Sequence, residues 1–405
     1  AEDRVDHVWS RSASGEATYS KYHYDSLGKL VYTVSSSTRS DVDGMPDIDV
    51  GTVGSLNAGD IDSLLSAGMS IAVYDTVNNR IDHTWSRNES GEAAFTKYHY
   101  HYDVTGALVY TVSGSDRAAV ENLSGVTVDN VRTLTASDID SLLSAGMSIT
   151  VYAEGSDQVD HVWSRDDTGK ATFTKYNYNS DDQLVFTISG ANRSEVENVT
   201  GVTVDTAAGL TVDQVESALS AGMSIAVYDI SENRVDHVWS RTEDGDISFT
   251  GYTYDTMGKL VYTVSGNNRN EVENISGITV SNADSLSESD IDSILGAGMS
   301  ISVYDTVNGR VDHVWSRSSA GKASFTKYHY DTLGKLVFTV TGTSRSSVES
   351  LSGITAGNVN SLTEADIDSY VTAGMSIAVY DTVNNRIDHV WARSDVGDRS
   401  FTKYH

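Results

Sequence analysis

The chain has 405 residues, no cysteine and a formal net charge of −29. The lack of cysteine excludes disulfides and thiolate zinc sites. The acidic balance argues against nucleic acid and anionic membrane surfaces as partners, because both bind basic faces. No apolar run reaches the roughly 18 residues that a membrane span needs, so no span is expected.

One unit of sequence recurs along the whole chain. The phrase [VI]-D-H-[VT]-W-[SA]-R contains all six tryptophans, which are Trp9, Trp85, Trp163, Trp239, Trp315 and Trp391. Such a fixed period is typical of tandem-repeat architectures, and we expect these tryptophans to form the core of each repeat. The predicted boundaries are 1–68 (partial), 69–146, 147–222, 223–298, 299–374 and 375–405 (partial). Both ends fall inside a repeat, so we expect the chain to be a section of a longer polymer.

Four strands are predicted in each repeat. In the second repeat these are M-S-I-A-V-Y (69–74), R-I-D-H-T-W-S-R (80–87), A-A-F-T-K-Y-H-Y (93–100) and L-V-Y-T-V-S-G (108–114). Short turns join them, which predicts an antiparallel meander. Strict alternation puts Val5, His7 and Trp9 on one face and Asp6 on the other. We therefore expect Asp6 and His7 to point apart.

A capped helix is predicted after the fourth strand. The phrase R-x-x-V-E-N, at 117–122, indicates a turn or half-helix. The residues that follow it, near Val126, indicate a short strand. Thr135 and Asp138 form a capping box, and Gly146 predicts the helix end. No linker separates the repeats. The predicted fold is mainly β, with one short helix per repeat, arranged as an open rod or superhelical array.

The hairpin between the third and fourth strands reads Y-x-Y-D-x-x-G-K-L. It occurs at 22–30, 252–260 and 328–336, and residues 178–184 depart from it. This phrase resembles the YD repeat of RHS-type and teneurin-type surface proteins, over about a third of each unit. The resemblance implies a large, repetitive, extracellular β protein. It does not imply a toxin-enclosing shell.

The recurring Asp-His pair is the first candidate for chemistry. With no strained Ser turn beside it, we expect a structural histidine packed beside Trp, with a metal or pH-sensitive contact as the alternative. Hence we do not expect an enzyme.

Two further sets of polar residues are candidate sites. The unusual loop of the first repeat carries Asp41, Asp43, Asp47 and Asp49, which suggest either a calcium site or an acidic surface loop. Asn122, Asn198 and Asn274 stand in glycosylation sequons at one repeat position. No other cofactor is expected.

The tyrosines of the third strand indicate cross-strand packing, with sugar binding through ring faces as the alternative. The function predicted is a structural segment of an extracellular fibre, stalk or adhesin on a microbial surface, with neighbouring repeats or chains as partners. The alternative is a propeller-like module that binds glycans.

Overall fold

The computed structural model describes residues 4–11, 17–88, 91–101, 106–351, 353–382 and 386–404. The chain divides into two compact units. Unit 1 comprises Ala1–Ala208, Gly222–Ile225 and Ile230–Asn233. Unit 2 comprises Gly209–Ala221, Ala226–Asp229 and Arg234–His405.

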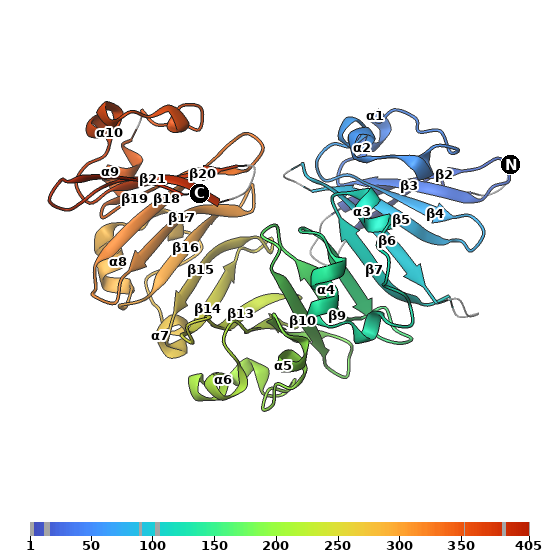
Figure 1. Cartoon of the computed structure of the whole chain (residues 1–405), viewed down its shortest axis with the longest axis horizontal. Helices are drawn as coiled ribbons and strands as arrows, with labels where there is room; N and C mark the ends of the chain where they lie inside the picture. The colour runs from blue at the N-terminus through green and yellow to red at the C-terminus, as the bar shows by residue number, and fades with distance from the viewer. Residues whose placement is uncertain are drawn as a thin grey trace. The chain divides into compact units, whose positions relative to one another are not determined.

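Unit 1 is an antiparallel sheet in which strands consecutive in the chain lie side by side (Figure 1). Its strands are β1 (His7–Arg11), β2 (Ala17–Tyr24), β3 (Leu30–Ser36), β4 (Ser70–Asp75), β5 (Arg80–Arg87), β6 (Ala93–Tyr100), β7 (Leu108–Gly114), β8 (Ser148–Tyr152), β9 (Val159–Arg165), β10 (Ala171–Tyr178) and β11 (Leu184–Gly190). Its helices are α1 (Arg39–Gly44), α2 (Ala58–Leu64), α3 (Arg117–Glu121), α4 (Ala136–Leu142) and α5 (Arg193–Glu197), with the 3-10 helices η1 (Val53–Ser55) and η2 (Val131–Thr133).

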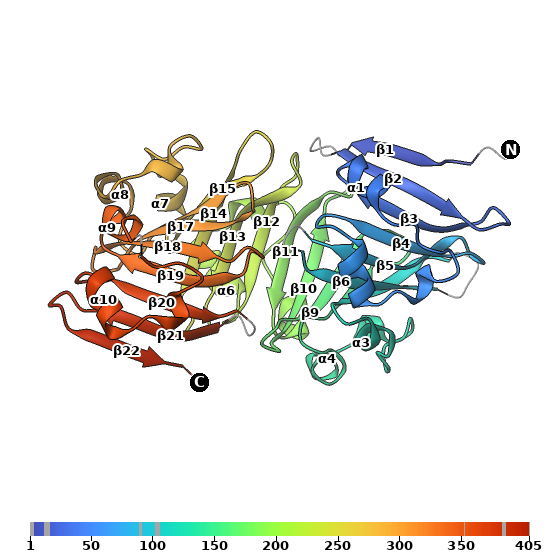
Figure 2. The same cartoon turned by 90° about the horizontal axis from the view of Figure 1, so that it is seen from above.

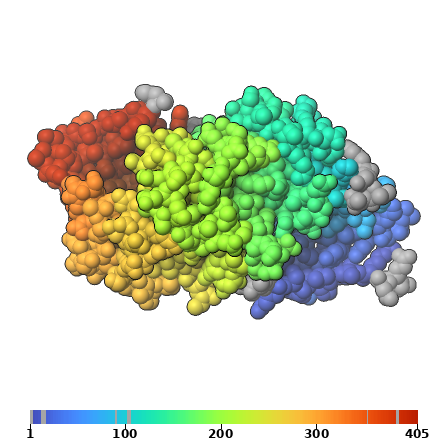
Figure 3. Space-filling view, turned by 90° about the horizontal axis from the view of Figure 1, so that it is seen from below, coloured from blue at the N-terminus to red at the C-terminus, as the bar shows by residue number. Residues whose placement is uncertain are grey.

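Unit 2 has the same arrangement, again with repeat beside repeat in chain order (Figures 2 and 3). Its strands are β13 (Arg234–Arg241), β14 (Ile247–Tyr254), β15 (Leu260–Gly266), β16 (Ser300–Asp305), β17 (Arg310–Arg317), β18 (Ala323–Tyr330), β19 (Leu336–Gly342), β20 (Ser376–Asp381), β21 (Arg386–Arg393) and β22 (Arg399–Lys403). Its helices are α6 (Val212–Ala218), α7 (Arg269–Glu273), α8 (Glu288–Ile294), α9 (Arg345–Glu349) and α10 (Glu364–Tyr370), with η4 (Ala283–Ser285) and η5 (Val359–Ser361). Strand β12 (Ser224–Asp229) and η3 (Ala207–Gly209) contain residues of both units.

The predicted fold class is confirmed: the protein is mainly β, with antiparallel meanders, short capped helices and a sheet that stays open. The predicted capping boxes are present at the start of α2, α4, α6, α8 and α10. These side chains satisfy backbone N–H groups that the first turn leaves without partners. Among the described residues, none of the helices is both long and apolar enough to cross a membrane.

Each helical layer covers the face of the sheet that carries the tryptophans. Across neighbouring strands the register aligns Ile71, Trp85, Phe95 and Gly114, and the first three side chains are fully buried. A small residue suits the end of this row, since a Cβ on Gly114 would lie 3.0 Å from Met147 Cγ, and the equivalent residue of the first repeat is Ser36. Met147 opens the next repeat, so the core continues from repeat to repeat.

The tryptophans differ in burial according to their neighbours. Trp85, Trp163, Trp239 and Trp315 are fully buried, whereas Trp9 is 52% exposed. Trp9 lies in β1, which among the described residues is paired with β2 alone. The core role therefore depends on a covering neighbour.

Two details of the predicted repeat were wrong. The segment near Val126 is a turn leading into η2, because Asn130 accepts from the Thr127 N–H (2.8 Å) and donates to the Gly125 carbonyl (2.7 Å). Such local side-chain hydrogen bonds compete with strand pairing. In addition, α4 ends at Leu142, short of Gly146.

Gly146 instead makes the turn into β8. Its φ of +75° suits glycine, and its N–H donates to the Arg165 carbonyl at 2.8 Å. The end of α4 is satisfied by Arg165, whose Nη1 donates to the carbonyls of Asp140 (3.2 Å) and Leu143 (2.7 Å).

Replacing a covered tryptophan should destabilise the protein far more than replacing the uncovered one. We expect Trp163→Ala to lower the free energy of unfolding by about 3–5 kcal/mol, because it leaves a cavity in the core. Trp9→Ala should change it by less than about 1 kcal/mol. Urea unfolding followed by circular dichroism measures both, and equal losses would contradict this account of the core.

Candidate functional site

A β-bulge gives the recurring Asp-His pair its geometry. In β16 and β17, Val303 pairs with His313 and Tyr304 pairs with Val311, which leaves Asp312 as the extra residue. A bulge turns two successive side chains toward the same side of the strand. Asp312 Oδ2 therefore lies 2.7 Å from His313 Nδ1. The prediction that Asp and His point apart was wrong, both where this bulge is present and at Asp6 and His7, where β1 is paired with β2.

The same contact recurs in the other repeats. The Nδ1–Oδ2 distances are 3.0 Å for His7–Asp6, 2.7 Å for His83–Asp82, 2.6 Å for His161–Asp160, 2.7 Å for His237–Asp236 and 2.6 Å for His389–Asp388.

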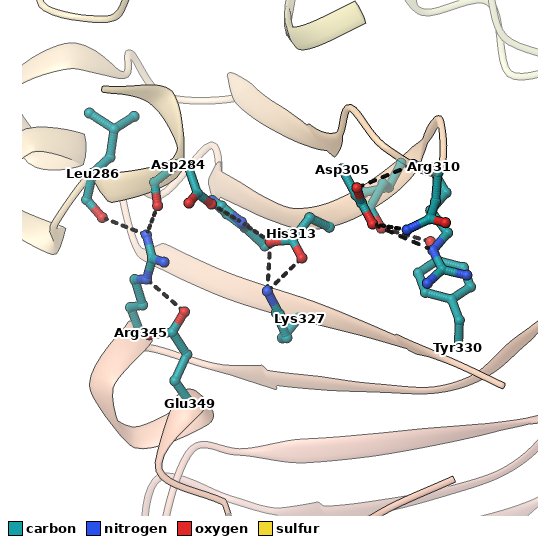
Figure 4. Close-up of polar contacts among 12 residues, drawn as sticks. Asp284, Leu286, Asp305, Arg310, His313, Lys327, Tyr330, Arg345 and Glu349 are labelled. Atoms are coloured by element: carbon teal, nitrogen blue, oxygen red, sulfur yellow. Dashed lines mark hydrogen bonds and ion pairs between the residues drawn. The ribbon is translucent and has the colours of Figure 1, made fainter. Parts of the chain in front are cut away.

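A lysine of the third strand completes the cluster, as Figure 4 shows for the repeat 299–374. The register pairs His313 with Lys327, and Lys327 Nζ lies 2.6 Å from Asp312 Oδ2. Equivalent contacts join Lys97 to Asp82 (2.7 Å), Lys175 to Asp160 (2.5 Å) and Lys403 to Asp388 (2.5 Å). In the repeat 223–298 the lysine position is Gly251, so that cluster consists of Asp236 and His237. We call these groups the Asp-His-Lys clusters.

The clusters hold the carboxylate in its charged form. Burial opposes ionisation of Asp312, but the hydrogen bonds from His313 and Lys327 outweigh it and lower its pKa to about 2. The pKa of Asp82 and that of Asp160 also lie well below the usual range, chiefly through the hydrogen bond from the adjacent histidine. An ionised carboxylate can only accept, so the histidine Nδ1 is the donor.

The histidine side chain turns inward from the carboxylate. Burial lowers the pKa of His161, which favours its neutral form. His313 is fully buried and its ring centroid lies 5.1 Å from that of Phe325. Its Nε2 is enclosed among protein atoms without a hydrogen-bond partner. The ring therefore packs in the core and is closed off from solvent.

One of these clusters has the residue types of a metal site. In the described residues, Asp284, Asp312 and His313 form a group of ligand-type atoms, with His313 Nδ1 3.9 Å from Asp284 Oδ1. The Lys327 ammonium already neutralises Asp312, and Asp284 is 83% exposed. Lys327 thus balances the charge of Asp312, whereas the Asp284 carboxylate is exposed to solvent.

Two arginines of each repeat contact the preceding repeat, and sequence reasoning missed both. We call them the clamp arginines. The first ends the second strand: Arg87, Arg165, Arg241 and Arg317 donate to carbonyls at the ends of α2, α4, α6 and α8. The second opens the short helix after the fourth strand. Arg117 donates to the carbonyls of Leu56 (2.6 Å) and Gly54 (2.8 Å), and its guanidinium lies 5.2 Å from the Phe95 ring centroid.

The second clamp arginine makes the same kind of contact in later repeats. Arg193 donates to Leu134, Arg269 to Leu210, and Arg345 to Asp284 and Leu286. A signal for these arginines was present in the sequence, since both stand at a fixed place in every full repeat.

The four carboxylates of the first repeat have separate surroundings. Asp41 and Asp43 lie in α1, whereas Asp47 and Asp49 lie in the loop that follows. Asp43 accepts from Arg39 (2.8 Å), and Asp49 accepts from the Gly51 N–H (2.6 Å). Among the described residues, no three of these four side chains bring their carboxylate oxygens close enough together to hold one metal ion. Calcium at this loop stays a prediction.

The three sequon asparagines occupy equivalent surface positions. Asn122, Asn198 and Asn274 are the C-cap residues of α3, α5 and α7, and all are exposed. Their position permits modification, and glycosylation stays a prediction.

The similarities to known proteins are distant. No family profile and no curated protein matches the chain. The Tc holotoxin pore of Photorhabdus luminescens is similar with a TM-score of 0.20 and 11% identity, over 98% of this chain and 22% of that chain. A porin-like protein from Bacteroides uniformis is similar with a TM-score of 0.16 and 10% identity, over 83% of this chain and 87% of that one. This chain thus spans about a fifth of the toxin chain, and similarities this weak carry no argument about function.

Removing a clamp arginine should loosen the contact with the preceding repeat. We expect Arg117→Met to lower the free energy of unfolding by about 1–3 kcal/mol, because the carbonyls of Gly54 and Leu56 lose a charged donor. Arg39→Met is the matched control. Arg39 holds the same place in the first repeat, but it is 57% exposed and bonds Asp43 of its own helix. It should cost less than about 1 kcal/mol, and urea unfolding that shows the same loss for both variants would contradict the clamp.

The Asp-His-Lys cluster predicts a pH dependence of stability. A carboxyl whose folded pKa is about 2, below its ordinary value of about 3.9, stabilises the folded state above the ordinary pKa. This stabilisation is lost as the pH falls toward 2. Asp312→Asn should therefore lower the urea midpoint at pH 6, and the difference from the unmodified protein should shrink as the pH falls. Asp205→Asn, at an exposed position, is the control. A difference that stays constant from pH 6 to pH 2 would refute the assignment.

Proposed function

We propose that this chain is a structural segment of an extracellular tandem-repeat fibre, stalk or adhesin from a microbial surface. The observation that carries the proposal is strand pairing across the repeat boundary. The last strand of one repeat, β7, pairs with the first strand of the next, β8, through Tyr110–Val151, Thr111–Thr150, Val112–Ile149 and Ser113–Ser148. The same register recurs between β3 and β4, β15 and β16, and β19 and β20.

This pairing makes the repeat an element of a continuous sheet. Each boundary adds the two clamp arginines to the backbone hydrogen bonds, so each repeat is held by its chain neighbour. Length then follows from copy number. The charge of −29 supports this role because it keeps a long polymer soluble.

The extracellular location rests on the composition and on the hairpins. A chain without cysteine does not depend on the redox state of its surroundings. The Y-x-Y-D-x-x-G-K-L hairpins form the turn between the third and fourth strands, as at Asp331 and Gly334, where the Gly334 N–H donates to the Asp331 carbonyl at 3.1 Å. This is the part of the repeat that resembles the YD phrase of surface proteins.

Electron microscopy of the native material, without tags or refolding, tests the proposal. We expect continuous filaments or stalks with a regular axial period. Immunogold labelling of whole cells with an antibody against the chain should place them outside the cell. Discrete compact particles of one chain, or label confined to the cell interior, would contradict it.

A further inference from the structure

The face of the unit 2 sheet opposite the helices carries a row of tyrosines. These are Tyr228, Tyr252, Tyr304, Tyr328 and Tyr380, one on every second strand from β12 to β20. In β18, Tyr328 lies three residues after the buried Phe325, so alternation puts the two side chains on opposite faces. We call this surface the open face.

The phenols of the row lie close to one another across repeat boundaries. Burial raises the pKa of Tyr252, and the neighbouring phenols of Tyr304 and Tyr228 raise it further. The pKa of Tyr328 is raised in the same way by burial and then by Tyr380 and Tyr304. All five side chains remain partly exposed. Strands two apart are separated by about 10 Å, so the rings recur at an interval comparable with the length of a disaccharide.

Uncharged hydroxyl groups surround these rings. Alternation assigns to the open face the hydroxyl groups of Ser300 and Ser302 in β16, Ser316 in β17, Ser324 and Thr326 in β18, and Thr341 in β19, together with the buried Thr339. None of these side chains is ionisable. Cross-strand hydrogen bonds fix several hydroxyls, as between Ser316 and Ser324 (2.8 Å) and between Thr326 and Thr341 (2.9 Å). Such a neutral surface is unusual for a chain with a net charge of −29.

The open face is hollowed in both units. In unit 2 a hollow of about 510 Å³ is lined by Ser300, Ser316, Ser324 and Thr341, with Lys322 at its margin. Lys322 is ion-paired with Asp395 (2.7 Å), which neutralises it. In unit 1 a hollow of about 560 Å³ is lined by Tyr22, Tyr24, Leu30 and Thr76, among others. The unit 1 hollow therefore combines tyrosine rings with Lys29, whereas the unit 2 hollow is lined by hydroxyl groups and Arg317 and includes no tyrosine of the row.

We propose that the open face binds an extended, uncharged polysaccharide. Sugar rings present C–H faces that pack on tyrosine rings, and hydroxyls that pair with Ser and Thr. A second copy of this face is disfavoured as the occupant, because two chains of −29 repel each other. An anionic polysaccharide is disfavoured for the same reason. This activity goes beyond the proposed structural role and does not depend on filament formation.

Affinity gel electrophoresis of the full chain tests this proposal with hydroxyethyl cellulose, galactomannan and dextran as neutral probes, and carboxymethyl cellulose as the charged comparison. We expect at least one neutral probe to retard the protein, and the charged one to bind more weakly. The double variant Tyr252→Ala/Tyr328→Ala should weaken binding at least tenfold, or by 1.4 kcal/mol. Tyr252→Phe/Tyr328→Phe keeps both rings and should keep most of the affinity.

Tyr370→Ala removes a tyrosine of α10, which lies on the helical side of the sheet and outside the row, so it should leave binding unchanged. Circular dichroism and urea midpoints establish that every variant is folded. The proposal is overturned if no neutral probe binds, or if the double alanine variant binds as well as the original. It is also overturned if sedimentation shows a dimer that the double alanine variant abolishes, since the occupant would then be a second copy. A protein that binds no polysaccharide could still form filaments. Equally, compact particles in the electron microscope would not exclude polysaccharide binding by the open face.

Discussion

The pairing of the last strand of each repeat with the first strand of the next is the interaction on which the rest of the structure depends. It makes the boundary between repeats equivalent to a contact inside one, as the β7–β8 and β15–β16 registers show. It also aligns the buried rows, so that Met147 of one repeat packs against Gly114 of the repeat before. An edge strand without such a partner exposes its core residue, as Trp9 does.

Dependence on the neighbour extends to the helices. Helices of five or seven residues are too short to be stable alone. Capping boxes satisfy the first turn of α4, but its last carbonyls are satisfied by Arg165 of the next repeat. The Asp-His-Lys clusters act inside the repeat, where a bulge turns Asp312 to His313 and Lys327 ties the third strand to it. Packing within a repeat and coupling between repeats therefore use different residues.

The sequence predicted those features whose signals are local. Strand alternation, the period of the tryptophans and the Thr135–Asp138 capping box each lie within a few residues or in a simple repeat, and the structure contains the strands and the capping box as predicted. The bulge at Asp312 was not predictable from alternation, because it exists only in the register between two strands. The clamp of Arg117 joins it to carbonyls more than 60 residues earlier, and backbone acceptors leave no mark in a sequence. The turn at Thr127 and Asn130 was mistaken for a strand since its apolar residues alternate in the same way.

Urea unfolding of chains that contain residues 69–222, 69–298 and 69–374 tests most directly whether each repeat is stabilised by its neighbours. These chains hold two, three and four full repeats and differ in the number of boundaries between them. If strand pairing and the clamp arginines couple adjacent repeats, the urea midpoint should rise with repeat number and the transition should steepen. The same midpoint and the same steepness in all three chains would show that the repeats unfold independently, and would contradict the account.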